Sequence, residues 1–179
     1  MDLANRRAVT MAIDRLQPQA GESLLDVGCG TGAALAQVAR RAPCTMVGVD
    51  PSEAMLAMAR KRLGGAATLL DASLGSLPLP DAMFDAALAL NVLYFCDREG
   101  RMLRDLYRVL RPGGRLVAYV THRDTMQRWK FVEAGLHRLY DAQALRQALA
   151  QGGFAIDAVM IHEAKVAPGV RGLFAMATR

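Results

Sequence analysis

The sequence predicts an α/β fold with a doubly wound, mostly parallel sheet. Short apolar runs alternate with helical patterns over the first two thirds of the chain, and two further apolar runs near the C-terminus have no helix between them. Strands separated by helices are joined by right-handed crossovers, which make them parallel. We therefore expect a Rossmann-like sandwich of three layers, in which the last two strands form an antiparallel pair at the sheet edge.

The chain divides into a regular series of expected elements. Segment 1–20 holds a leading helix, whose apolar residues recur at helical spacing over 4–16. A last helix over 141–151 precedes FAIDAVMIH and RGLFAMAT, the two runs that flank Pro168 and Gly169. We expect helices between the first four strands and before the fifth. These strands are rich in leucine, alanine or β-branched residues and lie at 23–27, 45–49, 67–70, 86–90 and 115–121.

The first expected strand runs directly into a glycine-rich loop. The stretch LLDVGCGTG, from Leu24 to Gly32, precedes the helical pattern AALAQVARR. Glycines at Gly28, Gly30 and Gly32 permit a tight strand-to-helix turn whose amide N–H groups can approach a ligand closely. The same letters match the dinucleotide fingerprint, with Ala33 in its last small position. The loop indicates a nucleotide-like cofactor without naming it.

Polar side chains follow the other expected strands. Asp50 ends the run MVGVD, near the offset of about 20 residues from the loop at which a carboxylate accepts hydrogen bonds from a ribose. Each acidic residue taken singly could instead cap a helix or form a turn. The carboxyl ends of parallel strands share one edge, so we expect a single ligand site there. It should bring together Asp26, Asp50, Asp71, Asn91 and Thr121.

Five motifs in order resemble one protein family. They are LLDVGCGTG, VGVDPSEAML, DASLGSLPLPDAMFD, LNVLYFCD and RVLRPGGRL. Together they are similar to the class I S-adenosylmethionine-dependent methyltransferases, in particular the type 11 group, over about 22–116. The segment HRLYDAQALRQALAQGGF resembles the last helix of that group. The resemblance implies that S-adenosylmethionine is the cofactor and that S-adenosylhomocysteine is its product.

The same resemblance implies roles for individual residues. Asp26 and the loop backbone would hold the methionine moiety, and Asp50 would bind the ribose hydroxyls. Met55 would cover one face of the adenine, while Asp71 would contact its edge together with the Ala72 amide. The Asn91 backbone would help to seat the methionine amino group. The expected cofactor-binding residues are Asp26, Gly28, Cys29, Gly30, Gly32, Asp50, Pro51, Met55, Asp71, Ala72 and Asn91.

Methyl transfer from a sulfonium does not demand a fixed catalytic residue. The reaction is an in-line displacement with a good leaving group, so positioning and exclusion of water can supply most of the rate. Tyr94 and His122 lie at the expected mouth of the site and could deprotonate or orient an acceptor. A polar mouth residue without a catalytic role is the alternative for His122.

Segment 123–140 is the best candidate for a substrate lid. It contains the only tryptophan, Trp129, together with His137 and Tyr140, and we expect these three residues to face the substrate. A simple amphipathic crossover that packs on the sheet is an equal alternative. A short lid suits a compact acceptor covered by a homodimer partner, or a group displayed on a larger molecule. We expect a small-molecule acceptor.

Composition is typical of an ordinary globular protein. With 179 residues, 53% of them hydrophobic, the chain fits one domain over 1–179. Cys29, Cys44 and Cys96 lack the spacing of metal ligands, so we expect reduced thiols, no metal site and a cytoplasmic location. No apolar run approaches the ~18 residues that a membrane span needs.

The net charge of +5 raises the question of nucleic acid. Four arginines recur at helical steps between leucines, which is typical of a solvated helix face. With one tryptophan and four tyrosines and no appended basic module, the chain is not expected to bind nucleic acid. The arginines are Arg98, Arg101, Arg104 and Arg108.

Other functions stay open on the sequence alone. The chain could methylate RNA or protein, or it could be a partner subunit that binds the cofactor without catalysis. A nicotinamide-dependent reductase is a further alternative, but a dehydrogenase does not need Asp71, and the RPGG turn is foreign to it. Binding of S-adenosylmethionine rather than NADH would separate these classes.

Overall fold

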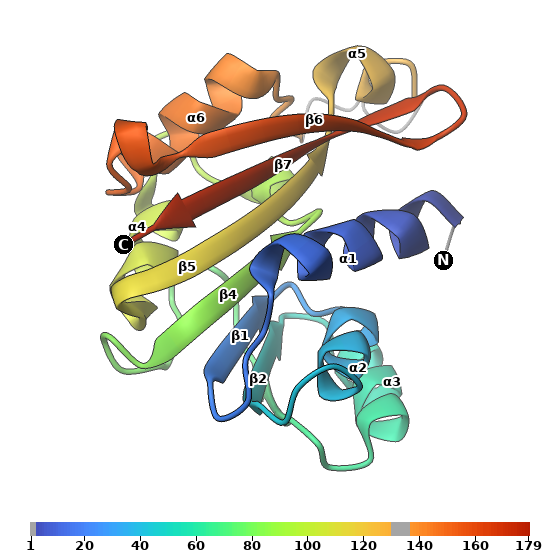
Figure 1. Cartoon of the computed structure of the whole chain (residues 1–179), viewed down its shortest axis with the longest axis vertical. Coiled ribbons are helices and arrows are strands. Elements are labelled where there is room, and N and C mark those ends of the chain that lie inside the picture. Colours follow the sequence, from blue (N-terminus) through green and yellow to red (C-terminus); the bar gives the residue numbers. More distant parts are fainter. Residues whose placement is uncertain (1–2, 130–136) are drawn as a thin grey trace.

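The computed structural model describes residues 3–129 and 137–179, which form three layers around a seven-stranded sheet (Figure 1). The strands are β1 (Ser23–Val27), β2 (Thr45–Asp50), β3 (Thr68–Asp71), β4 (Phe84–Leu90), β5 (Leu110–Thr121), β6 (Met160–Ala167) and β7 (Val170–Thr178). Their order in the sheet is β3-β2-β1-β4-β5-β7-β6. The strands β1 to β5 are parallel, whereas β7 is antiparallel to both β5 and β6. The predicted fold class, with its antiparallel C-terminal pair, is confirmed.

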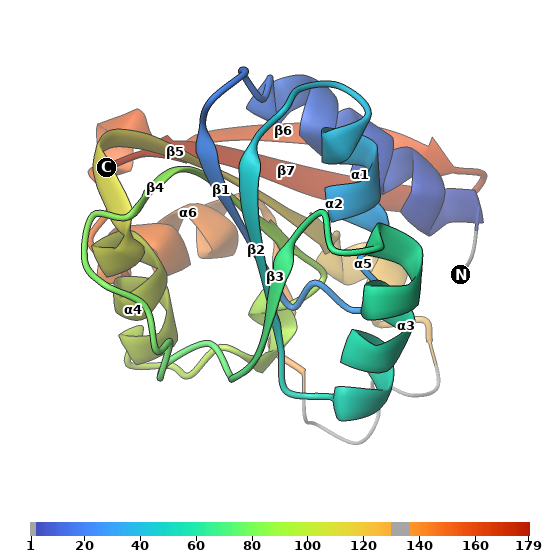
Figure 2. The same cartoon turned by 90° about the horizontal axis from the view of Figure 1, so that it is seen from below.

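Helices cover both faces of this sheet. The α-helices are α1 (Leu3–Leu16), α2 (Ala33–Ala39), α3 (Glu53–Leu63), α4 (Arg101–Val109), α5 (Arg123–Met126) and α6 (Ala142–Gln151), and short 3-10 helices are η1 (Leu93–Phe95) and η3 (Ile156–Ala158). Figure 2 shows α1, α2 and α3 on one side of the sheet and α4 and α6 on the other. The buried side chains agree, since Ile13, Leu35 and Leu56 belong to one apolar cluster and Leu103 and Leu149 to the other.

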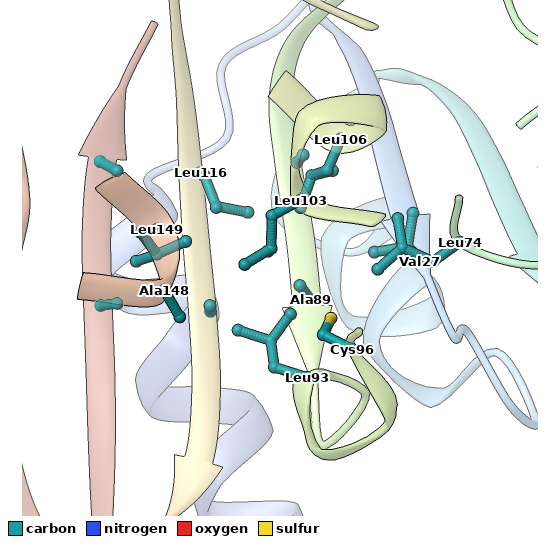
Figure 3. Packing of buried hydrophobic residues seen from close by; sticks show 14 of the residues in the cluster. Val27, Leu74, Ala89, Leu93, Cys96, Leu103, Leu106, Leu116, Ala148 and Leu149 are labelled. Carbon is teal, nitrogen blue, oxygen red and sulfur yellow. The ribbon is translucent and has the colours of Figure 1, made fainter. Parts of the chain in front are cut away.

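The central strands are buried on both faces, which explains their nearly continuous apolar sequences. Along β5, Leu116 and Ala118 pack in the cluster under α4 and α6, whereas Val117 and Tyr119 pack in the cluster under α1 to α3. Successive side chains of a strand point to opposite faces, so this alternation fits a strand between two helical layers. Figure 3 shows Leu116 pointing toward Leu103 of α4. Burial of each such leucine contributes about 1.5–3 kcal/mol.

One predicted helix is absent. Segment 72–83, which joins β3 to β4, is fully described and contains turns but no helix. Pro78 and Pro80 lack the N–H group that a helix interior uses. The segment is held by α4 instead, because Asp105 Oδ2 accepts a hydrogen bond from the Leu77 N–H at 2.7 Å. The prediction of helices between all of the first four strands was therefore wrong here.

The arginines near α4 do not form the single solvated face that the sequence predicts. Arg98 lies before the first residue of α4. Arg108 pairs with Asp105 of its own helix at 2.6 Å and reaches the segment before β4, where it pairs with Asp81 at 2.7 Å. It also donates to the Leu79 carbonyl oxygen at 2.7 Å. Arg108 thus ties α4 to the loop, and only part of the predicted stripe faces solvent.

The fifth strand begins earlier than expected. It starts at Leu110, which pairs with Phe84, and its next partners across the ladder are Arg115 and Ala86. The RPGG stretch therefore forms a bulge opposite Asp85 rather than a turn that precedes the strand. This irregularity lets Arg115 reach the C-terminal end of α1.

Arg115 joins three elements at this end of the sheet. Its guanidinium forms a fork with Glu22, with both N···O distances at 2.7 Å, and it donates to the Leu16 carbonyl oxygen at 2.7 Å. The hydrogen bond from Arg115 is the main cause of a lowered Glu22 pKa, against which burial acts. Bidentate pairing of this kind depends on the planar guanidinium.

We expect Arg115→Lys to lower the free energy of unfolding by about 1–2 kcal/mol, because an ammonium cannot replace the fork and the carbonyl contact together. Urea unfolding at pH 7 measures this. Arg101→Lys, at a pair whose arginine side chain is 72% exposed, is the control and should change stability by less than about 0.5 kcal/mol. Because the Glu22 pKa is lowered, the extra stability should be lost as the pH falls below the ordinary carboxyl range. Equal stability of Arg115→Lys and wild type would contradict the structural role.

Candidate active site

The carboxyl ends of the parallel strands bring the predicted site residues to one edge of the sheet. Asp26 lies within β1 beside Gly48 of β2, and Asp50 and Asp71 are paired at the ends of β2 and β3. Asn91 follows β4, and its N–H donates to the Tyr119 carbonyl oxygen at 2.9 Å. The convergence that the strand pattern predicts is therefore present in the fold.

Two adjoining cavities open at this edge. The first, which we call the loop cavity, has a volume of about 460 Å³ and is lined by the glycine loop, by Met55 of α3 and by α1. The second, the aromatic cavity, has a volume of about 320 Å³ and is lined by residues of η1, β5 and the segment after α5. Asn5 of α1 and Asn91 line both cavities, so these two side chains stand where the cavities meet.

The predicted cofactor-binding residues divide between the cavity wall and its surroundings. Asp26, Gly28, Cys29, Gly30, Met55 and Asn91 line the loop cavity. The remaining predicted residues lie outside the described lining, although they belong to the same strand ends and loops. They are Gly32, Asp50, Pro51, Asp71 and Ala72.

The N–H groups of the three loop glycines are used within the protein, so they are not the free donors that the sequence suggested. The N–H groups of Gly28 and Cys29 both donate to the Val49 carbonyl oxygen, at 2.8 and 3.0 Å. The Gly30 N–H donates to Asp50 Oδ2 at 2.8 Å, and the Gly32 N–H donates to the Cys29 carbonyl oxygen. These bonds tie the loop to β2. The glycines therefore serve by leaving space and adopting positive φ rather than by offering donors.

Asp26 is the most unusual charged group of the site. It is 2% exposed, it lines the loop cavity, and its carboxyl group has no hydrogen bond or ion pair with the described residues. Burial, together with the neighbouring Asp50 charge, raises the pKa of Asp26 to about 8. A buried carboxyl without a partner costs stability, and a cation in the cavity would relieve that cost.

Asp50 is used by the protein itself. Its two carboxylate oxygens accept from the Gly30 N–H at 2.8 Å and from the Ser52 N–H at 2.9 Å. Each oxygen still has a lone pair for a further donor. Asp50 therefore fixes the loop and can also receive a ligand hydroxyl. Asp71, its partner in the strand register, is exposed.

Cys29 is a filler of the loop and not a nucleophile. The side chain is buried, and burial raises the pKa of its thiol to about 12. The thiolate, which is the reactive form, is therefore scarce at neutral pH.

The aromatic cavity contains a chain of hydrogen bonds. The Thr121 N–H donates to the Tyr94 hydroxyl at 2.5 Å, the Tyr94 hydroxyl donates to Asn91 Oδ1 at 3.0 Å, and Asn91 Nδ2 donates to Asn5 Oδ1 at 2.9 Å. Burial raises the pKa of Tyr94 to about 12. Tyr94 is thus a neutral, hydrogen-bonded wall residue at pH 7, which argues against its predicted use as a base.

His122 caps a helix rather than facing the cavity. Its Nδ1 accepts a hydrogen bond from the Asp124 N–H at 3.1 Å, at the start of α5, and lies 3.4 Å from a guanidinium nitrogen of Arg171. His122 is not among the described residues that line the aromatic cavity. This placement favours the alternative interpretation of His122, as a polar residue without a catalytic role.

The three predicted substrate residues have different positions. Trp129 and His137 line the aromatic cavity, and the His137 ring lies 5.3 Å from the ring of Phe95. Tyr140 is fully buried, and its hydroxyl donates to the Leu93 carbonyl oxygen at 2.8 Å, so it anchors η1 and does not face the cavity. Residues 130–136 of the candidate lid lie outside the described residues.

Several residues that line the two cavities were not predicted from the sequence. Asn5 and Val9 come from the leading helix, and Phe95, which is 58% exposed, follows Tyr94 in η1. The spacing of Asn5 and Val9 places them one turn apart on a single helix face. The sequence gives no sign of which end of the sheet that face would cover.

No group of three or more histidine, cysteine, aspartate or glutamate side chains among the described residues could hold a metal ion. None of their helices is long and apolar enough to cross a membrane.

Comparison with known proteins identifies the family. A family model described as a methyltransferase domain, of type 11, matches residues 25–118. A malonyl-[acyl-carrier protein] O-methyltransferase from Enterobacter lignolyticus is 30% identical over 176 residues, which is 94% of this chain and 69% of that protein. A demethylmenaquinone methyltransferase from Thermus thermophilus is 41% identical over 117 residues, which is 65% of this chain and 51% of that protein. The chain therefore belongs to the class I S-adenosylmethionine-dependent methyltransferases, in the type 11 group.

Solved structures share the fold. The Burkholderia thailandensis 1,6-didemethyltoxoflavin-N1-methyltransferase, with bound 1,6-didemethyltoxoflavin and S-adenosylhomocysteine, has a TM-score of 0.77 at 22% identity. The match covers 98% of this chain and 78% of that one. The chain spans about half the length of several curated relatives that it matches, including the Thermus protein.

The buried carboxyl of Asp26 predicts a stability that depends on pH. Its pKa is raised in the folded state above the unfolded value, so the folded protein binds the extra proton and loses stability as the pH rises from about 4 to 8. We expect Asp26→Asn to be more stable than wild type at pH 8.5, with the difference shrinking toward pH 5. Thermal melting across this range measures the effect.

Asp157→Asn, at an exposed position on η3, is the matched control and should melt like wild type at every pH. If Asp26→Asn were less stable than wild type at pH 8.5, the buried and uncompensated carboxyl would be refuted.

Proposed function

We propose that this protein transfers a methyl group from S-adenosylmethionine to a small molecule held in the aromatic cavity. The observation that supports this most is Asp26, a buried carboxyl that lines the loop cavity and has no partner among the described residues. The methionine moiety of the cofactor carries an ammonium group, which supplies the missing cation. Met55, which is 42% exposed and lines the same cavity, suits the face of an adenine ring.

The two cavities divide donor from acceptor. With the cofactor in the loop cavity, its methyl group would pass to the aromatic cavity near Asn5 and Asn91, which line both. The acceptor lone pair forms the bond to the methyl carbon while the carbon–sulfur bond breaks and its electron pair returns to sulfur. The aromatic walls exclude water, and they hold the acceptor in line with that bond.

The lining of the aromatic cavity favours a neutral, ring-containing acceptor. Its described wall residues include no aspartate, glutamate, lysine or arginine, and four of them are Tyr94, Phe95, Tyr119 and Trp129. Burial raises the pKa of both tyrosines, so they remain neutral. A volume of about 320 Å³ falls at the small end of ligand pockets. These features support a small molecule over RNA or protein as the acceptor.

His137 is the group best placed to take a proton from the acceptor. It lines the aromatic cavity, and the neighbouring Arg138 N–H donates to the Tyr94 carbonyl oxygen at 2.8 Å, which fixes the chain at this point. The ring nitrogen of a neutral imidazole can accept the proton that an O–H or N–H acceptor loses. We infer this role for His137 in place of Tyr94 and His122.

Binding of the cofactor should release a proton. Below pH 8 the Asp26 carboxyl of the free protein is mostly protonated, and pairing with an ammonium favours its ionised form. Affinity for S-adenosylmethionine should therefore rise with pH and level off near pH 8. Calorimetry at pH 6.5, in buffers of different ionisation enthalpy, should report release of about one proton.

Asp26→Asn should show no proton release and should bind the cofactor at least tenfold more weakly, because it loses a charge-assisted pair. An affinity that is constant from pH 6 to pH 8.5 in the wild type would rule out Asp26 as the partner of the ammonium.

Gly30 offers a test with a matched control. It has a φ of +52°, and a Cβ built there meets nothing within 4 Å, while Gly64 has a φ of +55° and equally open surroundings. Gly30→Val and Gly64→Val should therefore carry similar backbone strain, of about 1–2 kcal/mol. Gly30 lines the loop cavity and Gly64 does not, so of these two variants only Gly30→Val should abolish cofactor binding. Normal binding by folded Gly30→Val, judged by circular dichroism and calorimetry, would sink this placement of the cofactor.

A second candidate function is a partner subunit that binds the cofactor without turnover. The intact loop cavity is compatible with it. Cofactor binding without methyl transfer to any of a panel of phenols, quinols and heteroaromatic amines would favour this alternative. A homodimer, a single domain over 1–179 and a lid at 123–140 remain predictions that the same protein preparation can test by sedimentation and limited proteolysis.

A further inference from the structure

A third hollow lies on the helical face beside the loop cavity. It has a volume of about 540 Å³ and is formed by α1, the glycine loop, α2 and α3. Three arginines from three different elements line it: Arg6 of α1, Arg40 at the end of α2 and Arg62 of α3. We call it the arginine hollow. In Figure 1, α2 lies between α1 and α3.

The arginines of this hollow lack the partners that their neighbours have. The described lining includes no aspartate or glutamate, and none of the three forms an ion pair with a described residue. Adjacent arginines do, since Arg41 pairs with Asp14 and Arg60 pairs with Glu53. Three uncompensated guanidinium groups around one hollow repel one another, and an anion between them would turn that repulsion into attraction.

The floor of the arginine hollow is apolar. Val9 is buried, Ala33 and Ala36 present methyl groups, and the Met58 side chain is 53% exposed at its edge. A floor of this kind contributes affinity for the carbon skeleton of a ligand, whereas guanidinium groups bind phosphate oxygens in forked pairs. The combination fits a molecule with a phosphate at one end and an apolar body.

The hollow is also held in shape by contacts that do not use the arginine charges. The Thr10 hydroxyl of α1 donates to Gln37 Oε1 of α2 at 3.1 Å, which links two of its walls. Arg62 donates to the carbonyl and hydroxyl oxygens of Thr31 in the glycine loop, which positions its guanidinium. A guanidinium has five N–H donors, so Arg62 can keep these bonds and still bind an anion.

We propose that the arginine hollow is a binding site for a small organic phosphate, separate from the cofactor and acceptor cavities. Its volume lies within the range of small-molecule pockets. The described lining has no aromatic side chain on which a nucleobase could stack, which disfavours single-stranded nucleic acid. Val9, Thr31 and Ala33 line both this hollow and the loop cavity, so the two ligands would lie on opposite sides of one thin wall.

The test is calorimetric titration of the full chain with phenyl phosphate and with inorganic phosphate. Phenyl phosphate should bind, and inorganic phosphate should bind about three- to tenfold more weakly because it leaves the apolar floor uncovered. Arg40→Gln and Arg6→Gln should each weaken phenyl phosphate about tenfold or more, since each removes a charge-assisted contact. The matched control is Arg146→Gln. Arg146 is an exposed residue of α6 that forms no ion pair with a described residue, so this variant should bind like wild type.

Saturating S-adenosylmethionine should leave phenyl phosphate bound, and the Arg40→Gln variant should keep its affinity for S-adenosylmethionine. Displacement by S-adenosylmethionine would place the phosphate in the loop cavity and overturn the proposal. Absence of binding, equal losses in Arg40→Gln and Arg146→Gln, or tighter binding of a short single-stranded RNA than of phenyl phosphate would overturn it as well. Because cofactor binding is measured separately, failure of this site leaves the proposed methyl transfer intact.

Discussion

The arrangement of the site depends on a carboxyl group that the fold buries at the end of β1 without a cationic partner. Asp26 lies on β1 between β2 and β4 and is only 2% exposed, and the nearby Asp50 charge adds to the cost of ionising it. Buried charges are normally paired, so an isolated buried carboxyl costs stability unless a ligand supplies the opposite charge. The loop that follows is glycine-rich because its glycines adopt positive φ, and a Cβ at Gly28 or Gly32 would press on Val92 or on Leu63.

The glycine loop keeps its shape because it is bonded to the neighbouring strand. The Val49 carbonyl oxygen accepts two loop N–H groups, and Asp50 accepts a third. Only a strand adjacent to β1 can reach the loop in this way, so the β1–β2 pairing is part of the site. It follows that Asp50→Ala would disturb the loop as well as any ribose contact. The experiments on Asp26 and Gly30 separate binding from loop structure more cleanly.

The sequence predicted what the chain encodes locally. The strand ends at Asp26, Asp50 and Asn91 were predictable, because apolar runs and glycines mark them directly and parallel topology places them at one edge. The absence of a helix at 72–83 was not predicted. The general βαβ pattern favours a helix between two parallel strands, and it outweighed Pro78 and Pro80, which disfavour one. The mouth of the site was predicted least well. His122 and His137 look alike in sequence, and only tertiary contacts turn one into a helix cap and leave the other on a cavity wall.

The leading helix α1 turns the open edge of the sheet into separate compartments. Asn5 lines the loop and aromatic cavities, Val9 lines the loop cavity and the arginine hollow, and Arg6 lines the arginine hollow. Within about one turn, α1 thus places the Asn5 amide at the aromatic cavity, the Val9 methyl groups at the loop cavity and the Arg6 guanidinium at the arginine hollow. A cationic cofactor is repelled by that hollow and attracted by Asp26, so the charges on either side of the wall favour the same position for it. The same distribution directs an anionic ligand away from Asp26, and the two sites can be filled together because their charge preferences are opposite.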